Sequence, residues 1–170
     1  HESISKIELN DNILKNKSSL LEHSLTKNLK NKFQAFSFLV DRINKKKFDS
    51  ILSLGSGLTD IEYFLYLSLS KNKKIIASEF DRNFIKKSNE FFPEFETIEF
   101  DLFKDSLLEL NQDFDLVYSF GSFYVMDDIQ FIRLLKDIRS SGVKEIIDFH
   151  SGFMTQREYL KNLIKPFIST

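Results

Sequence analysis

The sequence predicts an α/β protein with a parallel sheet at its centre. From residue 50 onward, short apolar runs alternate with segments whose apolar residues recur at helical spacing, which is the pattern of βαβ units. Glycines follow several of these runs, where a chain that leaves a strand has to turn. The length of 170 residues corresponds to about one domain, and a core of that size folds without disulfides.

Five short runs are the predicted strands. They are residues 50–54, 74–79, 96–100, 115–119 and 145–149. Apolar residues three or four positions apart predict crossover helices between the strands. These stripes contain Ile61, Phe64 and Leu65, then Phe84, Ile85 and Phe91, and then Ile129, Ile132, Leu135 and Ile138. Asp81 and Asp128 stand where helix N-caps are expected.

An amphipathic helix is predicted over residues 26–45, ahead of the sheet. Its apolar stripe consists of Leu29, Phe33, Phe36, Leu39, Val40 and Ile43. Residues 45–47 are all lysine, and cations interact favourably with the dipole at the end of a helix. We expect residues 1–48 to form a helical cap on a core of residues 49–170, within one structural domain. A capping box at residues 155–158 predicts a last helix.

Composition excludes several function classes. The chain has no cysteine, which rules out a cysteine nucleophile, a thiolate zinc site and a cysteine-bound iron–sulfur cluster. No clustering of histidine with carboxylates suggests a metal site. A net charge of -1 gives no overall field that would attract polyanions, so nucleic acid is not favoured as a partner. The longest apolar run is too short to span a bilayer and no signal peptide is evident, so we expect a cytoplasmic protein.

The glycines indicate where a ligand site would lie. Four of the five, Gly55, Gly57, Gly121 and Gly152, come just after predicted strands. In open α/β sheets ligands bind at the carboxyl ends of the strands, where glycine permits tight turns and close approach. Loops also favour glycine for conformational reasons alone, and that alternative stays open for Gly121 and Gly152.

The motif Gly55-Ser56-Gly57, between a strand and a helix, is the start of a dinucleotide fingerprint. The third glycine of that fingerprint is missing, and its position is occupied by Asp60. A carboxylate there would occupy the free N–H groups of the helix and repel a pyrophosphate. A nucleoside ligand with a cationic centre and no phosphate, such as S-adenosylmethionine, would not be repelled.

An acid follows the glycine motif at the expected distance. Glu79 ends the second predicted strand, 22 residues after Gly57, which is close to the separation of about 20 at which an acid reaches a ribose held by a glycine loop. Its carboxylate can accept from two adjacent hydroxyls. Asp101, after the third strand, could accept from the exocyclic amine of a base or could be an ordinary turn residue.

Four segments in this order resemble the class I S-adenosylmethionine-dependent methyltransferase family, over roughly residues 33–165. They are residues 51–57 (ILSLGSG), 75–80 (IIASEF), 100–102 (FDL) and 114–119 (FDLVYS). The resemblance implies a Rossmann-like doubly wound parallel sheet with strand order 3-2-1-4-5. It also implies S-adenosylmethionine as the cofactor and S-adenosylhomocysteine as the product.

The same resemblance implies roles for individual residues. Gly55, Ser56 and Gly57 would pass around the methionine and ribose, and Glu79 would hold both ribose hydroxyls. Towards the base, Phe80 would pack on the adenine. The remaining cofactor contacts would come from Asp101 and Leu102 at the adenine, and from Phe120 and Gly121 near the methyl group.

The chain departs from the family pattern in three places. Ser53 stands where members usually carry an acid, and Thr59 stands where they often carry a third glycine. The family sheet normally has two more strands after the fifth, and these are missing from the sequence. An uncovered edge at residues 145–149 would invite pairing, so we expect a homodimer or a C-terminal continuation to cover it.

A small molecule, methylated on oxygen or nitrogen, is the predicted acceptor. His150, just beyond the fifth strand, is the best placed base for the acceptor proton, or is simply a loop histidine. Tyr124 and Ser122, beyond the fourth strand, could line the acceptor pocket. One alternative is a non-catalytic methyltransferase-like binding or interaction module. Another is a nicotinamide-dependent oxidoreductase, which Asp60 disfavours.

Overall fold

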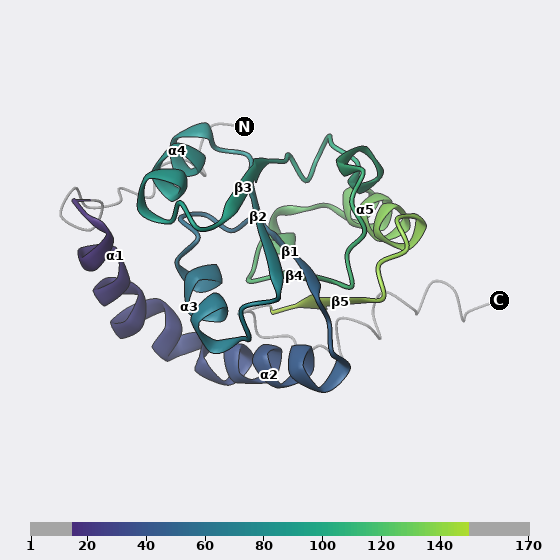
Figure 1. The fold of residues 1–170 in the computed structure, drawn as a ribbon. Helices are drawn as coiled ribbons and strands as arrows, with labels where there is room; N and C mark the ends of the chain where they lie inside the picture. The colour runs from purple at the N-terminus through teal and green to yellow at the C-terminus, as the bar shows by residue number, and fades with distance from the viewer. Residues whose placement is uncertain (1–14, 150–170) are drawn as a thin grey trace.

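The computed structural model describes residues 15–149, apart from the side chains of residues 28–31, and centres on one parallel sheet (Figure 1). Its strands are β1 Ser50–Leu54, β2 Lys74–Glu79, β3 Glu96–Glu99, β4 Leu116–Ser119 and β5 Glu145–Asp148. The order is β3-β2-β1-β4-β5, as predicted, and every neighbouring pair is parallel. β1 and β2 have the predicted bounds, whereas each of the other three strands is one residue shorter.

Helices cover both faces of the sheet. One face is covered by α1 Lys17–His23, η1 Ser24–Leu29, α2 Lys30–Lys46, α3 Asp60–Ser68 and α4 Arg82–Phe91. The other face is covered by η2 Leu107–Leu110, η3 Phe123–Val125 and α5 Asp128–Ser140. Figure 1 shows α2 and α3 on the opposite side of the sheet from α5.

Alternation along the strands supplies both hydrophobic layers. In β1, Ile51 belongs to the core under α1–α4, whereas Leu52 and Leu54 belong to the core under α5. In β4, Tyr118 belongs to the core under α1–α4 and Val117 belongs to the core under α5. All five side chains are fully buried, which explains why the strands read as nearly continuous apolar runs.

The N-terminal helical segment differs from the prediction. A single helix was expected over residues 26–45, but the segment begins at Lys17, after the Asn16 side chain caps the N–H of Ser19, and includes the π-helical turn η1. Phe33, expected on the apolar stripe, is 62% exposed. It lies one turn before the buried Phe36 and close to η1, where the change of helical period ends the regular stripe.

Ionic contacts fix this segment to the rest of the chain. The guanidinium of Arg42 in α2 donates two hydrogen bonds, of 2.6 and 2.7 Å, to the carboxylate of Glu145 in β5. The ammonium of Lys17 in α1 lies 3.0 Å from Glu94 and 4.3 Å from the ring centre of Tyr63 in α3. The helical segment is therefore held at both ends.

One of the two predicted caps is correct. Asp81 caps α4 by accepting from the N–H of Asn83. For α5 the cap is Asp127 rather than Asp128, because Gln130 completes a capping box with Asp127. Ile129, expected on the apolar stripe, is 80% exposed, and the buried face of α5 carries Phe131, Leu134 and Ile138. The capping box expected at residues 155–158 lies outside the described residues.

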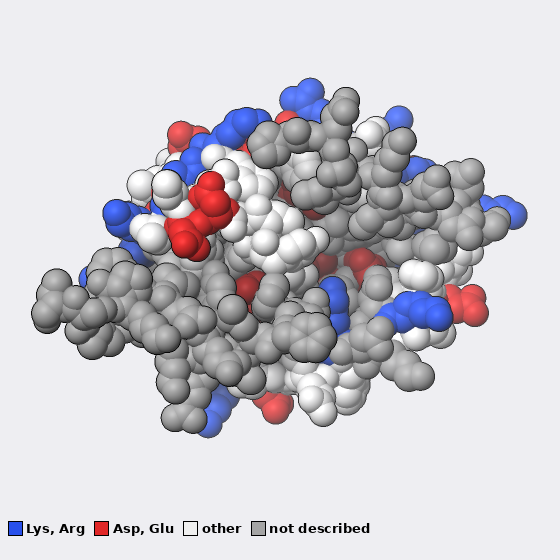
Figure 2. All heavy atoms as spheres, turned by 180° about the vertical axis from the view of Figure 1, so that it is seen from behind, with Lys and Arg blue, Asp and Glu red and all other residues white. Residues whose placement is uncertain are grey.

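The described surface carries charges of both signs. In Figure 2, lysine and arginine side chains are scattered over this face rather than gathered into one patch, and acidic atoms are visible in a hollow near its centre. Among residues 15–149, no helix combines the length and the hydrophobicity that a membrane span requires.

The carboxylate of Asp115 should stabilise the fold, because it joins the starts of β1, β4 and β5. It accepts from the N–H groups of Asp49 and Ser50 and lies 2.6 Å from the ammonium of Lys144. Burial alone would raise the pKa of Asp115, but the hydrogen bonds from Lys144, Asp49 and Ser50 lower it. A lowered pKa in the folded state contributes stability above the unfolded pKa, and that stability is lost as the pH falls through the folded value.

We therefore expect Asp115→Ala to lower the free energy of unfolding by about 1.5 to 3 kcal/mol at neutral pH. Urea unfolding between neutral and acidic pH measures the effect, and the difference from the parent should shrink as the carboxylate becomes protonated. Asp113→Ala is the control, since Asp113 is exposed nearby. Equal effects of the two substitutions would contradict the assigned role of Asp115.

Candidate functional site

The turn after β1 is built on two glycines with left-handed backbones. Gly55 has φ +68° and Gly57 has φ +59°, a region that other residues enter at a penalty. The hydroxyl of Ser122, from the loop after β4, donates to the carbonyls of Leu54 and Gly55. A Cβ on Gly55 would clash with the Ser122 hydroxyl and would lie 2.7 Å from the Ser122 Cβ. Residue 55 is therefore glycine for both conformational and steric reasons.

This turn lies at the point in the sheet where the order of the strands reverses. β1 pairs with β2 on one side and with β4 on the other, so the chain leaves β1 towards one side and leaves β4 towards the other. In open α/β sheets the diverging loops leave a crevice at such a point, and ligands bind there. Ser122, which was expected to line an acceptor pocket, joins the loops after β1 and β4 through these hydrogen bonds.

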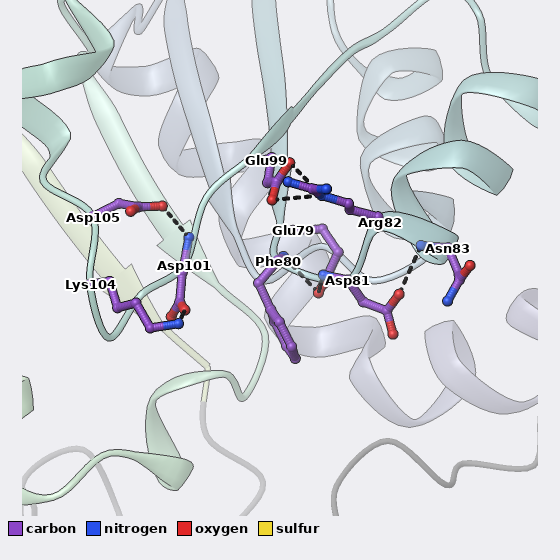
Figure 3. A network of polar contacts seen from close by, with 9 residues as sticks. All are labelled: Glu79, Phe80, Asp81, Arg82, Asn83, Glu99, Asp101, Lys104 and Asp105. Atoms are coloured by element: carbon purple, nitrogen blue, oxygen red, sulfur yellow. Dashed lines mark hydrogen bonds and ion pairs between the residues drawn. The ribbon is translucent and has the colours of Figure 1, made fainter.

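Glu79 lies against the turn, as the spacing predicted. Its Oε2 accepts from the N–H of Gly57 at 2.9 Å, and its Oε1 accepts from the N–H groups of Phe80 at 2.9 Å and Asp81 at 3.1 Å. The side chain is 5% exposed. A carboxylate has about four acceptor positions, so three protein donors leave room for a ligand hydroxyl. Figure 3 shows Glu79 beside Phe80 and Asp81.

The side chain of Phe80 is exposed, whereas the carboxylate of Asp101 already accepts hydrogen bonds within the chain. The Phe80 side chain is 62% exposed and projects away from the backbone in Figure 3. Asp101 accepts from the N–H of Phe103 and from the ammonium of Lys104, at 2.9 and 2.7 Å. Burial opposes ionisation of Asp101, but these hydrogen bonds lower its pKa. Leu102 is buried, and its carbonyl accepts from Arg133.

Aromatic rings surround the end of β4. The ring of Phe120 stacks on that of Phe149, with centres 4.6 Å apart, and meets Tyr118 edge to face at 5.8 Å. Gly121 follows with φ +82°. Tyr124, in η3, is 66% exposed. His150, the predicted base, lies outside the described residues.

Two acids that sequence reasoning did not assign to the site are buried in the first turn of α3. Asp60 was expected to occupy the free N–H groups of the helix, but its carboxylate instead accepts from the hydroxyl of Ser24 in η1. Glu62 Oε1 accepts from the hydroxyls of Ser53 at 2.6 Å and Tyr118 at 3.0 Å. Glu62 interrupts an otherwise apolar run, and that interruption was the available signal.

Burial raises the pKa of Glu62 to about 7. The hydrogen bond from Ser53 opposes this rise and the charge of Asp60 adds to it. Burial also raises the pKa of Tyr118, and the nearby charge of Glu62 raises it further, so the phenol stays a donor. The cluster can therefore change its charge near neutral pH through Glu62.

The turn after β1 predicts the outcome of two glycine substitutions. Gly57→Ala meets only the conformational penalty, about 1 to 2 kcal/mol, because nothing lies within 4 Å of the added Cβ. Gly55→Ala meets the same penalty and the clash with Ser122, so it should destabilise the fold more. Thermal unfolding of both variants checks this. A smaller loss for Gly55→Ala than for Gly57→Ala would contradict the packing described here.

Comparison with known proteins supports the fold through structure rather than sequence. No family model matches the sequence, and a search of curated proteins finds no match. A crystal structure of the plantazolicin methyltransferase BpumL, in complex with a pentazolic desmethylPZN analogue and SAH, is similar with a TM-score of 0.59. The identity is 18%, over 85% of this chain and 59% of that one.

Two further structures are similar over most of their own length. A TehB-like SAM-dependent methyltransferase from Corynebacterium glutamicum gives a TM-score of 0.55 at 17% identity, over 84% of this chain and 82% of that one. The methyltransferase domain of bacterial CtHen1 gives 0.59 at 10% identity, over 78% and 80%. By contrast, this chain spans about half the length of the plantazolicin enzyme. The strand order and these similarities show that the chain has the fold of class I S-adenosylmethionine-dependent methyltransferases.

Proposed function

We propose that this chain binds S-adenosylmethionine and transfers its methyl group to an oxygen or nitrogen of a small molecule. The observation that carries the proposal is the carboxylate of Glu79, held against the N–H of Gly57 at the carboxyl ends of β2 and β1. Three protein N–H groups occupy three of about four acceptor positions on Glu79, which leaves one position for a ribose hydroxyl. The exposed ring of Phe80 follows directly and offers a surface for a flat base.

The residues around the turn fit the cofactor. Open space lies beside Gly57, where a Cβ would meet no atom within 4 Å. The hydroxyl of Ser56 is buried and has no hydrogen-bond partner among the described residues, so a ligand group could supply one. Asp60 and Glu62 provide negative charge near a cationic ligand, and neither forms an ion pair within the described part of the chain.

Each end of the cofactor would be held by different residues. Glu79 would hold the ribose, because it is already oriented by the N–H groups of Gly57, Phe80 and Asp81. Asp101 would take the adenine amine only after giving up Lys104. That exchange is easy, since the Lys104 side chain is 79% exposed and an ion pair of such a side chain is weak.

When bound, S-adenosylmethionine would supply a methyl group carried on a sulfonium sulfur. A lone pair of the acceptor would form the new bond to this methyl group, and the carbon–sulfur bond would break to leave a thioether. The contribution of the chain is positional, because holding the acceptor in line with the methyl group gives most of the rate enhancement. Phe120 and Gly121 would border the methyl group, and the stacked rings of Phe120 and Phe149 would exclude water. Tyr124 would contact the acceptor, and His150 would take its proton.

The acceptor proposal is supported by the aromatic rings near the end of β4. Phe38 meets Phe149 edge to face at 6.2 Å and is 53% exposed, so the stack of Phe120 and Phe149 is extended by a third ring. An organic molecule with a flat or apolar part suits such a surface. The plantazolicin methyltransferase, similar in fold, was crystallised with a pentazolic analogue.

Cofactor binding tests the proposal through a matched pair of variants. Glu79→Gln should weaken the binding of S-adenosylhomocysteine by roughly 10- to 100-fold, because one charged hydrogen bond acceptor is lost. Glu99 is the control, since it is the register partner of Glu79 on β3 and pairs with the exposed Arg82. Glu99→Gln should bind as the parent does. Calorimetric titration measures both, and a parent chain that does not bind would refute the proposal.

Turnover is tested separately from binding. Incubation with S-adenosylmethionine labelled in its methyl group and a panel of small phenols, acids and amines should yield a labelled product. Tyr124→Phe should change the Michaelis constant for the acceptor and leave the affinity for the cofactor as it was. Binding of cofactor without transfer to any panel member would favour a non-catalytic binding module instead.

A further inference from the structure

The buried acids of α3 have more negative charge than their protein partners can satisfy. Glu62 is 2% exposed and Asp60 is 7% exposed. Glu62 Oε1 accepts two hydrogen bonds, from Ser53 and Tyr118, whereas Glu62 Oε2 has no hydrogen-bond partner among the described residues. A buried acceptor without a partner is costly, and a buried carboxylate without a counter-ion is more so.

The cluster lies near the carboxyl ends of β1 and β4. Ser53 and Tyr118 are partners in the ladder between β1 and β4, one residue before the pair that ends it. Glu62 therefore accepts hydrogen bonds from both β1 and β4, the two strands at which the strand order reverses. Ser53 is also two residues before Gly55, and Tyr118 is two residues before Phe120.

The hydrogen bonds orient the carboxylate for a ligand. Two hydroxyl donors on Oε1 fix the plane of the Glu62 carboxylate and leave Oε2 as its unused acceptor. Ser24 holds Asp60 from the side of η1, and π-helical turns often occur at functional sites. A helix dipole favours acids in a first turn, and the backbone N–H of Glu62 lowers the pKa of its own carboxylate, but neither effect explains why the carboxylate is buried.

We infer that Oε2 of Glu62 is the counter-ion of the ammonium group on the amino-acid part of the bound cofactor. This inference rests on the proposed function and assigns the methionine end of the same site. An ammonium group has three donors and one positive charge, so it satisfies the free oxygen and offsets the charge of an ionised Glu62.

Binding of the ammonium then releases a proton. Burial holds the pKa of Glu62 at about 7 in the free chain, and a cation at Oε2 favours the ionised form. Affinity therefore rises as the pH rises through that pKa. The titratable groups that face Glu62 within the described residues are Asp60 of the same helix and Tyr118 of β4, and the hydroxyls of Ser53 and Ser24 complete the cluster.

The test compares two ligands that differ in the amino-acid part. S-Adenosylhomocysteine carries the ammonium group, whereas 5′-methylthioadenosine has the same adenosine and thioether without it. Glu62→Gln should weaken the first ligand by roughly 10- to 100-fold and leave the second unchanged. Glu79→Gln should weaken both, because it acts on the shared ribose. Calorimetry from about one pH unit below to one above the pKa of Glu62 should show a pH-dependent affinity for S-adenosylhomocysteine that Glu62→Gln abolishes.

The outcomes separate this inference from the proposed function. A parent chain that binds neither ligand refutes the proposed function. If the parent binds S-adenosylhomocysteine and Glu62→Gln binds it equally well at every pH, the function stands and the role of Glu62 is overturned. Equal weakening of both ligands by a folded Glu62→Gln would also overturn it, since the effect would then be structural.

Tyr118→Phe keeps the test decisive if Glu62→Gln does not fold. It removes one hydrogen bond to the ionised carboxylate and keeps the ring that packs on Phe120. The pKa of Glu62 should rise, so the pH dependence of S-adenosylhomocysteine affinity should move to higher pH. An unshifted pH profile with intact binding would contradict the inference.

Discussion

The left-handed turn after β1 is the constraint on which the rest of the site depends. The Gly57 N–H donates to Glu79 of β2, and the Gly57 carbonyl accepts from Ser88 of α4. Gly55 lies against Ser122 of the loop after β4. Three separate elements thus reach the same few backbone atoms, and each contact requires the chain to turn as only glycine does readily. The residues around the turn are therefore positioned relative to it.

The polar groups around the turn are expensive to bury, and the fold accommodates them by pairing. Thr59, itself left-handed at φ 63°, donates to Ser88, and Ser53 donates to Glu62. Two hydrophobic layers on either side of the sheet supply the stability that permits such burial. Only a few atoms, such as Ser56 Oγ and Glu62 Oε2, lack a described partner, and both belong to residues of the turn or of the helix that follows it.

The sequence predicted the sheet and the position of Glu79 because those features are local. A buried strand between helices is an apolar run, and the 22-residue spacing from Gly57 follows from one βαβ unit. The cap of α5 was misplaced by one residue because two aspartates stand together, although Gln130 favours Asp127. The partners of Asp60 and Glu62 were not predictable, since Ser24, Ser53 and Tyr118 come from three distant segments. The spacing of apolar residues indicates which face of a helix is buried, but it does not indicate which hydroxyl group contacts that face.

The link between Ser24 and Asp60 extends the site to the N-terminal helical segment. Asp60 opens α3, directly after the turn, and Ser24 lies in the π-helical turn between α1 and α2. Because Arg42 joins α2 to β5, the segment contacts both the acid cluster and the strand next to β4. The buried hydroxyl of Ser24 is thus the contact through which the helical segment meets the acids next to the turn.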